Sequence, residues 1–321
     1  MGAINVLSEP VVNKIAAGEV IERPASVVKE LVENALDADA SRVTVEVEDG
    51  GKKLIRVTDD GVGMPKEDLA LAFASHATSK LSTDDDLFSV ATFGFRGEAL
   101  TSIGAVSHAR IVSRPRGSVE AGEVEMQGGE PGPVKAKGAP EGTTVEAANL
   151  FFNVPARRKF LRTAKTEFAH VVDHVSRIAL AHPHVEFRLI HNGRETVALQ
   201  PTEDRRRRMG DLHGRELAGA LLEVDSGEGP VAVTGLVAPP VHCRANRKMQ
   251  LTYVNGRFVR DRRLSHAAAA AYEGLLVHGR FPVAALFVEA DPRQVDVNVH
   301  PTKIEVRFSR GDLVYKTVLN A

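Results

Sequence analysis

The spacing of apolar residues predicts an amphipathic helix early in the chain. Between Val27 and Leu36 the apolar side chains recur every three to four residues, so they fall on one side of a helix. The opposite side carries Glu30, Asn34 and Asp37. Ser26, which follows closely after a proline, is the N-cap that this pattern predicts. We therefore expect a helix that buries one side against a sheet and presents oxygen atoms on the other.

Alternating residues and glycine-rich turns follow this helix. Residues 54–58 alternate and are rich in β-branched side chains, which predicts a strand that ends at Asp59-Asp60-Gly61. Residues 94–97 contain two glycines and lead into a helical run over 98–103. A glycine-rich loop that opens a helix can bind an anion through its main-chain N–H groups, whereas a hairpin turn explains the strand and its glycine turn equally well.

The C-terminal third is typical of a separate α+β unit. The polar residues 201–214 form the expected junction, and Asn255-Gly256 between two alternating runs predicts a type I′ hairpin. The expected strands are 231–237, 250–254, 283–289, 295–300 and 304–308, and the expected helix is 264–277. The sequence thus predicts an α+β fold with two domains, residues 1–205 and 206–321.

Composition is that of a soluble globular protein. Of 321 residues, 43% are hydrophobic and 26% charged, which is enough for two cores of ordinary size. Cys243 is the single cysteine, so an internal disulfide is excluded, as is typical of a reducing compartment. No stretch has the length and apolar character of a membrane span or a secretion signal. We therefore expect a cytoplasmic protein without membrane contact.

Basic residues are clustered although the formal net charge is only −1. Residues 242–263 contain seven basic residues and one acidic residue, residues 205–208 are four arginines, and residues 157–162 contain four more basic residues. Such patches favour salt-sensitive contact with a DNA backbone, although a solvated surface is the simpler interpretation. No helix-turn-helix or zinc-finger spacing is present, so base readout is not predicted.

The acidic side of the first helix suits a hard cation and a reacting water, although for this helix alone a solvated acidic face is the simpler interpretation. Carboxylate and amide oxygens are ligands that Mg²⁺ accepts together with phosphates and water. A carboxylate at this place can also deprotonate an attacking water molecule. The spacing does not choose between Glu30 and Glu33 for that role.

The two glycine turns suit the other parts of a nucleotide. Asp59 at a strand end can accept a hydrogen bond from an exocyclic amine, and Gly63 lets the main chain approach a flat ligand. The loop 94–97 opens a helix, so its N–H groups can face phosphates. Residues 75–80 gather hydroxyls, an imidazole and an ammonium that can cover them. A P-loop motif is absent from the sequence.

In this order the segments resemble the Bergerat-fold (GHKL) ATPases, and in particular the ATPase region of MutL-type DNA mismatch-repair proteins. The resemblance covers nearly the whole chain and is weakest near residues 115–140 and 200–245. The segments that carry it are Ile15–Ser26, the helix that follows, Asp59–Gly63, Ser75–Lys80, Gly94–Leu100 and Phe151–Leu161. The first and the last of them point to MutL within the superfamily.

The resemblance implies a Bergerat-type α/β sandwich, a mixed sheet covered by helices, followed by a ribosomal-S5-like α+β domain. It implies that Glu30 is the general base, that Asn34 binds Mg²⁺, and that Asp59 binds the adenine amine of ATP. Position 60 is Asp where the family often has Asn. The other residues implied to bind ATP are Gly61, Gly63, Thr78, Ser79, Lys80, Gly94, Phe95, Arg96, Gly97 and Thr143, with Thr144 beside it.

A lysine in the second domain completes the implied ATP site. The run Val297-Asn298-Val299-His300-Pro301-Thr302-Lys303 looks like the family motif whose lysine reaches the γ-phosphate, so Lys303 joins Glu30 as a catalytic residue. The basic patches imply DNA contact at Arg157, Arg158, Arg257, Arg260, Arg262 and Arg263.

The implied function is that of an ATP-dependent mismatch-repair matchmaker. Slow Mg²⁺-dependent ATP hydrolysis would drive dimerisation through residues 15–22, clamping of DNA, and recruitment of a MutS-type mismatch-recognition protein and further repair factors. The ATPase half of a type II topoisomerase-like enzyme is the alternative. The chain stops before the family's usual dimerisation region, so we expect a fragment that is monomeric until ATP binds. We also expect it to be associated with the nucleoid and to contain no nuclease site.

Overall fold

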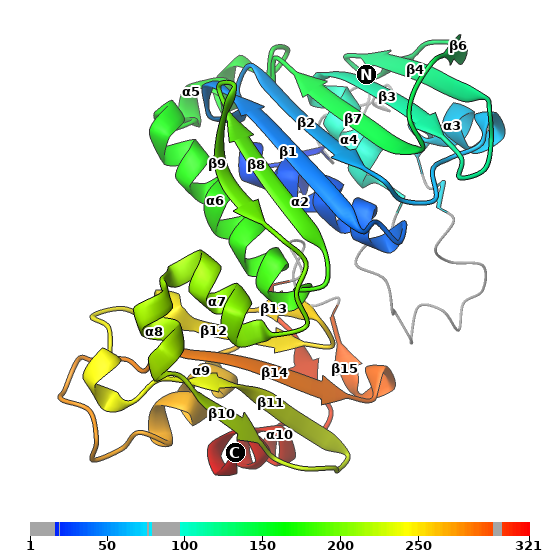
Figure 1. Ribbon diagram of the computed structural model, residues 1–321. Coiled ribbons are helices and arrows are strands. Elements are labelled where there is room, and N and C mark those ends of the chain that lie inside the picture. Colours follow the sequence, from blue (N-terminus) through cyan, green and yellow to red (C-terminus); the bar gives the residue numbers. More distant parts are fainter. Residues whose placement is uncertain (1–16, 19, 76, 79–96, 298–303) are drawn as a thin grey trace, which may run out of the picture. The chain divides into compact units, whose positions relative to one another are not determined.

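A computed structural model describes residues 17–18, 20–75, 77–78, 97–297 and 304–321 (Figure 1). The chain divides into two compact units. The described residues up to Val175, together with His184–Pro201, form the first unit, and Ser176–Pro183 with the described residues from Thr202 onward form the second. The domain limits 1–205 and 206–321 remain a prediction.

A mixed β-sheet forms the centre of the first unit. Its strands are β1 (Arg42–Glu48), β2 (Leu54–Asp59), β3 (His108–Arg114), β4 (Ala121–Gln127), β5 (Glu130–Pro131), β6 (Lys135–Lys137), β7 (Gly142–Ala148), β8 (Glu186–His191) and β9 (Arg194–Leu199). Their order is β5-β4-β3-β7-β2-β1-β8-β9, with β6 also paired to β4. Only the β1–β8 pair is parallel among these described strands.

Helices cover one face of this sheet, because alternate strand residues are fully buried on that side only. Helix α2 (Pro24–Asp37) packs on β1 and β2, and α4 (Ala99–Val106) packs on β3 and β4 (Figure 1). Helix α6 (Ala164–Ala181) packs on β8, where the rings of Phe168 and His191 stack with centroids 3.8 Å apart. The shorter helices of this unit are α3 (Lys66–Leu71) and α5 (Pro155–Phe160). The predicted mixed sheet covered by helices is confirmed.

Helix α2 buries the apolar side that its sequence pattern predicts. The buried apolar residues of the predicted segment are Val27, Val28, Leu31, Val32 and Ala35. The N-cap prediction was wrong: the helix begins at Pro24, and Arg23 precedes it without a side-chain cap. A proline suits the first turn because its missing N–H has no partner there anyway. Ser26 therefore lies inside the helix.

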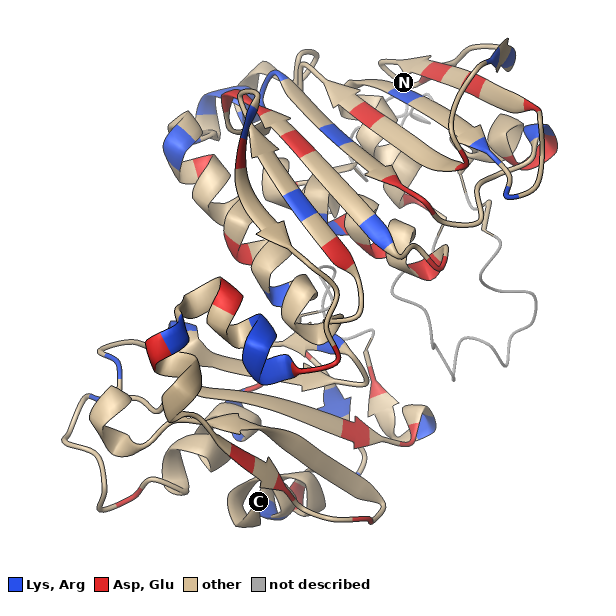
Figure 2. Ribbon diagram, in the orientation of Figure 1, with Lys and Arg blue, Asp and Glu red and all other residues tan. Residues whose placement is uncertain are grey.

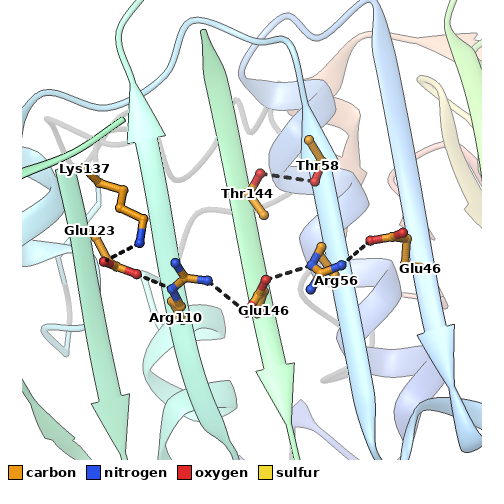
Figure 3. Close-up of polar contacts among 8 residues, drawn as sticks. All are labelled: Glu46, Arg56, Thr58, Arg110, Glu123, Lys137, Thr144 and Glu146. Carbon is orange, nitrogen blue, oxygen red and sulfur yellow. Dashed lines mark hydrogen bonds and ion pairs between the residues drawn. The ribbon is translucent and has the colours of Figure 1, made fainter. Parts of the chain in front are cut away.

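The other face of the sheet carries a row of opposite charges, one on each of six neighbouring strands (Figures 2 and 3). Glu146 on β7 is central, because it binds Arg56 on β2 (Oε1 to Nε, 2.7 Å) and Arg110 on β3 (Oε2 to Nη1, 3.4 Å). The row continues from Arg56 to Glu46 on β1, and from Arg110 to Glu123 on β4 and then Lys137 on β6. These six residues, the charge row, link strands whose inward faces carry the core.

The second unit is a five-stranded sheet between two layers of helices. Its strands are β10 (Leu222–Asp225), β11 (Val231–Val237), β12 (Gln250–Val254), β13 (Arg257–Val259) and β14 (Ala284–Ala290), in the order β10-β11-β14-β12-β13. Helices α7 (Arg205–His213) and α8 (Arg215–Ala220) pack on one face, and α9 (Arg262–Ala270) and α10 (Gly311–Asn320) on the other. A separate pair consists of β15 (Val295–Asp296) and β16 (Arg307–Phe308). None of the helices in the described residues could cross a membrane.

The hairpin prediction in this unit is confirmed, and three boundaries differ. Asn255 and Gly256 join β12 to β13 with φ values of 48° and 78°, as a type I′ turn requires. The expected junction 201–214 is largely helix α7, because Asp204 caps it and Met209 is buried in the core. The expected helix 264–277 ends at Ala270, and the expected strand 304–308 is reduced to β16.

Candidate functional site

Strand β2 turns alternate side chains toward the helices, and the last of these is an acid. Ile55 and Val57 are buried, and Asp59 follows them with 9% exposure. Its Oδ1 accepts hydrogen bonds from the main-chain N–H groups of Gly61 (2.9 Å) and Thr143 (3.3 Å). Among the described residues, nothing donates to Oδ2. Burial raises the pKa of Asp59 to about 6, although the two N–H groups oppose that shift.

The adjacent acid has the opposite environment. Asp60 Oδ1 accepts the main-chain N–H groups of Ser41 and Arg42, both at 2.8 Å, and Oδ2 accepts the Ser41 hydroxyl at 2.7 Å. Burial raises the pKa of Asp60, but these hydrogen bonds outweigh it and hold the pKa below its usual value. Asp60 thus fastens the start of β1 to the turn after β2.

The glycines of that turn are required by the packing of the chain on itself. A Cβ atom on Gly61 would lie 2.5 Å from the carbonyl oxygen of Ala38, and one on Gly63 would lie 2.2 Å from that of Arg114. Gly63 also has φ +70°. We expected Gly63 to make room for a flat ligand. The space beside both glycines is instead filled by main chain at the end of α2 and the end of β3.

A buried serine that the sequence analysis missed completes the polar cluster. Ser113, at the end of β3, is fully buried. Its Oγ accepts the N–H of Met64 (2.8 Å) and lies 2.9 Å from Oγ1 of Thr143. Thr144 faces the other side of the sheet (Figure 3), so only Thr143 of the two threonines contacts Asp59. The signal was available, because in β3, as in β2, the buried alternate positions end with a polar residue.

Lysine 29 holds the two glutamates of α2 together. Its Nζ lies 2.9 Å from Glu30 Oε1 and 3.0 Å from Glu33 Oε2. Burial lowers the pKa of Lys29, but the two carboxylates outweigh it and leave the pKa above its usual value, so the ammonium stays charged. The Glu30 side chain is 18% exposed and that of Glu33 is 7% exposed. Glu30 is therefore better placed to reach water, and Asn34 lies one turn further along the helix.

The first turn of α4 lies beside the start of the segment 75–80. Thr101 Oγ1 donates to the carbonyl oxygens of Phe73 (3.1 Å) and Ala74 (3.3 Å). Gly97 has φ +62°, and a Cβ atom there would lie 2.3 Å from the carbonyl oxygen of Ala77. Thr78 is exposed. Ser79, Lys80, Gly94, Phe95 and Arg96 lie outside the described residues, as does Lys303.

The segment Phe151–Leu161 holds the far end of the same helix. The main-chain N–H of Phe151 donates to the carbonyl oxygen of Val106 (2.7 Å), and Asn153 Nδ2 donates to that of Ala105 (2.9 Å). These are carbonyl groups in the last turn of α4, which lack helical partners. Phe151 is fully buried with φ 62°, a strained conformation that this packing enforces.

The candidate DNA-contact residues differ in accessibility. Four of these residues are exposed, namely Arg158 on α5 and Arg260, Arg262 and Arg263 around the start of α9. Both helices carry blue segments in Figure 2. Arg257, in contrast, is buried, with 8% exposure.

Arg157 contacts the N-terminal segment instead. Its Nη1 donates to the carbonyl oxygen of Ile21 (3.3 Å), and its guanidinium lies 5.9 Å from the ring centre of Phe151. A Cβ atom on Gly18 would collide with the same guanidinium. Arg157 is therefore positioned to anchor Gly18 and Ile21 rather than to face solvent.

Comparison with known proteins agrees with this geometry. Residues 21–128 match the family model of "Histidine kinase-, DNA gyrase B-, and HSP90-like ATPase", and residues 209–321 match that of "DNA mismatch repair protein, C-terminal domain". The DNA mismatch repair protein MutL of Geobacter sulfurreducens is 52% identical over 99% of this chain and 52% of its own length. That of Xanthomonas oryzae pv. oryzae is 49% identical over 99% of this chain and 52% of its own length. The chain belongs to the MutL family.

Solved structures share the fold of this chain. The Aquifex aeolicus MutL ATPase domain complexed with ADP is 29% identical, with a TM-score of 0.64 over 93% of this chain and 98% of that one. The N-terminal domain of a DNA repair protein shares the fold with a TM-score of 0.81 at 24% identity, over 96% of each chain. The expected α+β class with two domains is confirmed, and the names favour MutL over the topoisomerase alternative. The chain spans about half the length of the curated relatives that it matches.

Proposed function

We propose that this chain binds ATP and hydrolyses it slowly in a Mg²⁺-dependent reaction. The observation that carries the proposal is Asp59, a buried carboxyl with one oxygen fixed by two N–H groups and the other without a donor among the described residues. An exocyclic amine such as that of adenine supplies the missing donor. The match of residues 21–128 to an ATPase family and the ADP complex of the Aquifex aeolicus relative support the same assignment.

The acidic side of α2 suits the chemistry of hydrolysis. Glu30 is the more accessible of the two glutamates that bind Lys29, so it orients and deprotonates the attacking water. Lys29 holds the Glu30 carboxylate in place, and Glu33 holds Lys29 from the buried side.

Magnesium fits this site only with help from the substrate. The described residues contain no group of three or more His, Cys, Asp or Glu side chains that could hold a metal ion. The amide oxygen of Asn34 would hold Mg²⁺ together with phosphate oxygens and water, which are the ligands that this cation prefers. When bound, Mg²⁺ neutralises charge on the phosphates. Lys303, Ser79, Lys80 and the loop 94–97 belong to the same proposal through the resemblance.

The purpose of turnover in this proposal is to reset a switch. ATP binding joins two copies through the N-terminal segment, and the dimer encloses DNA and recruits a MutS-type partner and further repair factors. Exposed arginines at 158, 260, 262 and 263 contact the DNA backbone without sequence preference. The proposal no longer includes Arg157 and Arg257 as DNA contacts, because they are engaged or buried within the protein.

ATP hydrolysis by Glu30→Ala tests the assignment of the base. We expect at least a hundredfold slower turnover, because general base catalysis contributes about that much or more, with nucleotide affinity within a few-fold of wild type. Phosphate release and nucleotide titration measure the two quantities. Glu33→Gln is the matched control in the same ion-pair cluster, and it should keep most of the activity.

The two variants separate the possible outcomes. Unchanged turnover in Glu30→Ala with a large loss in Glu33→Gln would reassign the base to Glu33. Equal turnover in wild type and both variants would contradict hydrolysis at this site.

A further inference from the structure

The second unit contains a basic cavity of about 450 Å³ beside the β12–β13 hairpin. Asp261 is the only acidic residue that lines the cavity within the described part of the chain. The basic residues that line it are Arg177, Arg247, Lys248, Arg260 and Arg262. Its size is within the range of pockets that hold small organic ligands, and its charge favours an anion.

Two of these cations are held in place by aromatic rings. The guanidinium of Arg177 lies 4.4 Å from the ring centre of Phe258, and that of Arg247 lies 4.9 Å from that of Phe281. Within the described residues, Arg247, Lys248, Arg260 and Arg262 form no ion pair. The carboxylate of Asp261 accepts the N–H of Leu264 (2.9 Å) as the cap of α9. The cavity thus carries positive charge that this part of the protein does not neutralise.

Gln250 gives the cavity a second kind of chemistry. This first residue of β12 lines the cavity and is only 9% exposed. Neither its amide nitrogen nor its amide oxygen has a hydrogen-bond partner among the described residues. Buried amides are normally paired, so an unpaired one at a basic cavity indicates a ligand that both donates and accepts. An anion without a proton, such as sulfate, accepts hydrogen bonds but does not donate them.

We propose that this cavity binds one unpaired nucleotide, with the phosphate on the basic residues and the edge of the base on Gln250. The amide of glutamine presents a donor and an acceptor side by side, which matches the hydrogen-bonding edge of a base such as adenine. A cavity of about 450 Å³ has room for one nucleotide but not for a base that is stacked and paired in a duplex, so an unpaired nucleotide fits better. The inference rests on the proposed DNA contact and extends it from the backbone to a base. The nucleotide comes either from a DNA strand or from free solution.

The test compares labelled single-stranded oligoadenylate DNA with an abasic strand of equal length by fluorescence anisotropy on the full chain. Gln250→Met keeps the length of the side chain and removes the amide. We expect it to weaken binding of the base-containing strand about tenfold, the scale of one lost base contact, and to leave the abasic strand unaffected. Gln127→Met, at an exposed position of β4 in the first unit, is the matched control and should change the binding of neither strand.

A second variant and a competitor complete the test. Lys248→Ala should weaken both strands and lower the salt dependence by about one phosphate contact. If deoxyadenosine monophosphate displaces the labelled strand from wild type but not from Gln250→Met, the site binds free nucleotides. If it does not displace the strand from wild type, the site binds a nucleotide within a strand. Both results support the nucleotide site.

Three results would overturn the proposal. One is an equal effect of Gln250→Met on both strands, another is no effect on either strand, and the third is equal affinity of wild type for duplex and single-stranded DNA. DNA binding without dependence on Gln250 leaves the proposed function intact. Absence of any DNA or mononucleotide binding also removes DNA contact from that function, whereas ATP hydrolysis is judged separately by Glu30→Ala.

Discussion

Asp59 is a carboxyl group whose burial makes the fold less stable when it is ionised. Its folded-state pKa is raised to about 6 from the usual 3.8, mainly by burial. The folded state therefore binds the proton more tightly than the unfolded state does. Stability from this group is fully present below about pH 4, falls as pH rises toward 6, and stays lower above that. A residue that binds a ligand at the expense of the unliganded fold is typical of functional sites.

Asp59→Asn should therefore stabilise the unliganded protein at neutral pH and abolish nucleotide binding. The shift of about two pKa units corresponds to roughly 2–3 kcal/mol. Urea unfolding should show that difference near pH 7.5 and only about a third of it near pH 4.5, where Asp59 is protonated in the folded state but already largely ionised in the unfolded chain. Nucleotide titration should show no binding, because the amide presents a donor to the amine. A stability difference that is equal at both pH values would contradict the assigned cause.

Sequence reasoning named candidate residues for the site but not the contacts that hold them. Periodicity places Glu30, Asn34 and Asp59 on a definite side of a helix or a strand, whereas their roles come from the family resemblance. The clamp of Lys29 between two carboxylates was missed, although Lys29 and Glu33 stand four residues apart. The partners of Ser113 depend on strands that are distant in sequence, so no local pattern reveals them.

At the scale of elements, strand pairing brings the two halves of the polar cluster together. Asp59 on β2 lies opposite Thr143 on β7, and Ser113 on β3 lies opposite the same threonine. The charge row crosses these three strands on the other face, with Arg56, Glu146 and Arg110 directly opposite one another. A slip of one residue would break the row and turn Asp59 to the wrong face. The row therefore reinforces the register on which the site depends.

Glu146→Gln should weaken the fold in a salt-dependent way. The substitution leaves Arg56 and Arg110 on either side of a neutral residue, whereas both now bind one carboxylate. Because the pairs are partly exposed, we expect a loss of only about 1 kcal/mol at low salt, and less at high salt. Urea unfolding at two salt concentrations measures it. Glu195→Gln is the control, because Glu195 forms an isolated exposed ion pair with Arg188, and it should lower the free energy of unfolding less than Glu146→Gln does. Equal losses in the two variants would show that the charge row does not act as a network.

Element boundaries were hardest to predict where tertiary contacts override local character. The arginine-rich segment that we expected to be a junction is helix α7, because Arg208 and Met209 are fully buried. The Arg208 guanidinium donates to the carbonyl oxygen of Pro183 (2.5 Å), a residue far away in sequence. In contrast, the Asn255-Gly256 hairpin was predictable, since its turn geometry is determined by two adjacent residues.

At the scale of the whole molecule, the proposed switch requires that the N-terminal segment be held ready for a second copy. Arg157 contacts this segment at Ile21 and Gly18, and Phe151 beneath it also binds the end of α4. The helix that opens at the proposed phosphate loop and the segment proposed to join two copies thus meet at one motif. This gives a physical reason for the position of Phe151–Leu161 in the family pattern.

Arg157→Ala should therefore impair dimerisation more than nucleotide binding. With a non-hydrolysable ATP analogue and Mg²⁺, we expect wild type and Glu30→Ala to sediment as dimers. Arg157→Ala should need an about tenfold higher protein concentration to form dimers, because it loses one charge-assisted hydrogen bond and the packing around it. Nucleotide titration should give similar affinities for all three. Arg158→Ala is the matched control, because that side chain is exposed on the same helix. If both arginine variants dimerise like wild type, Arg157 does not anchor the N-terminal segment. If wild type itself stays monomeric with the analogue bound, the proposal of an ATP-gated dimer is wrong for this chain.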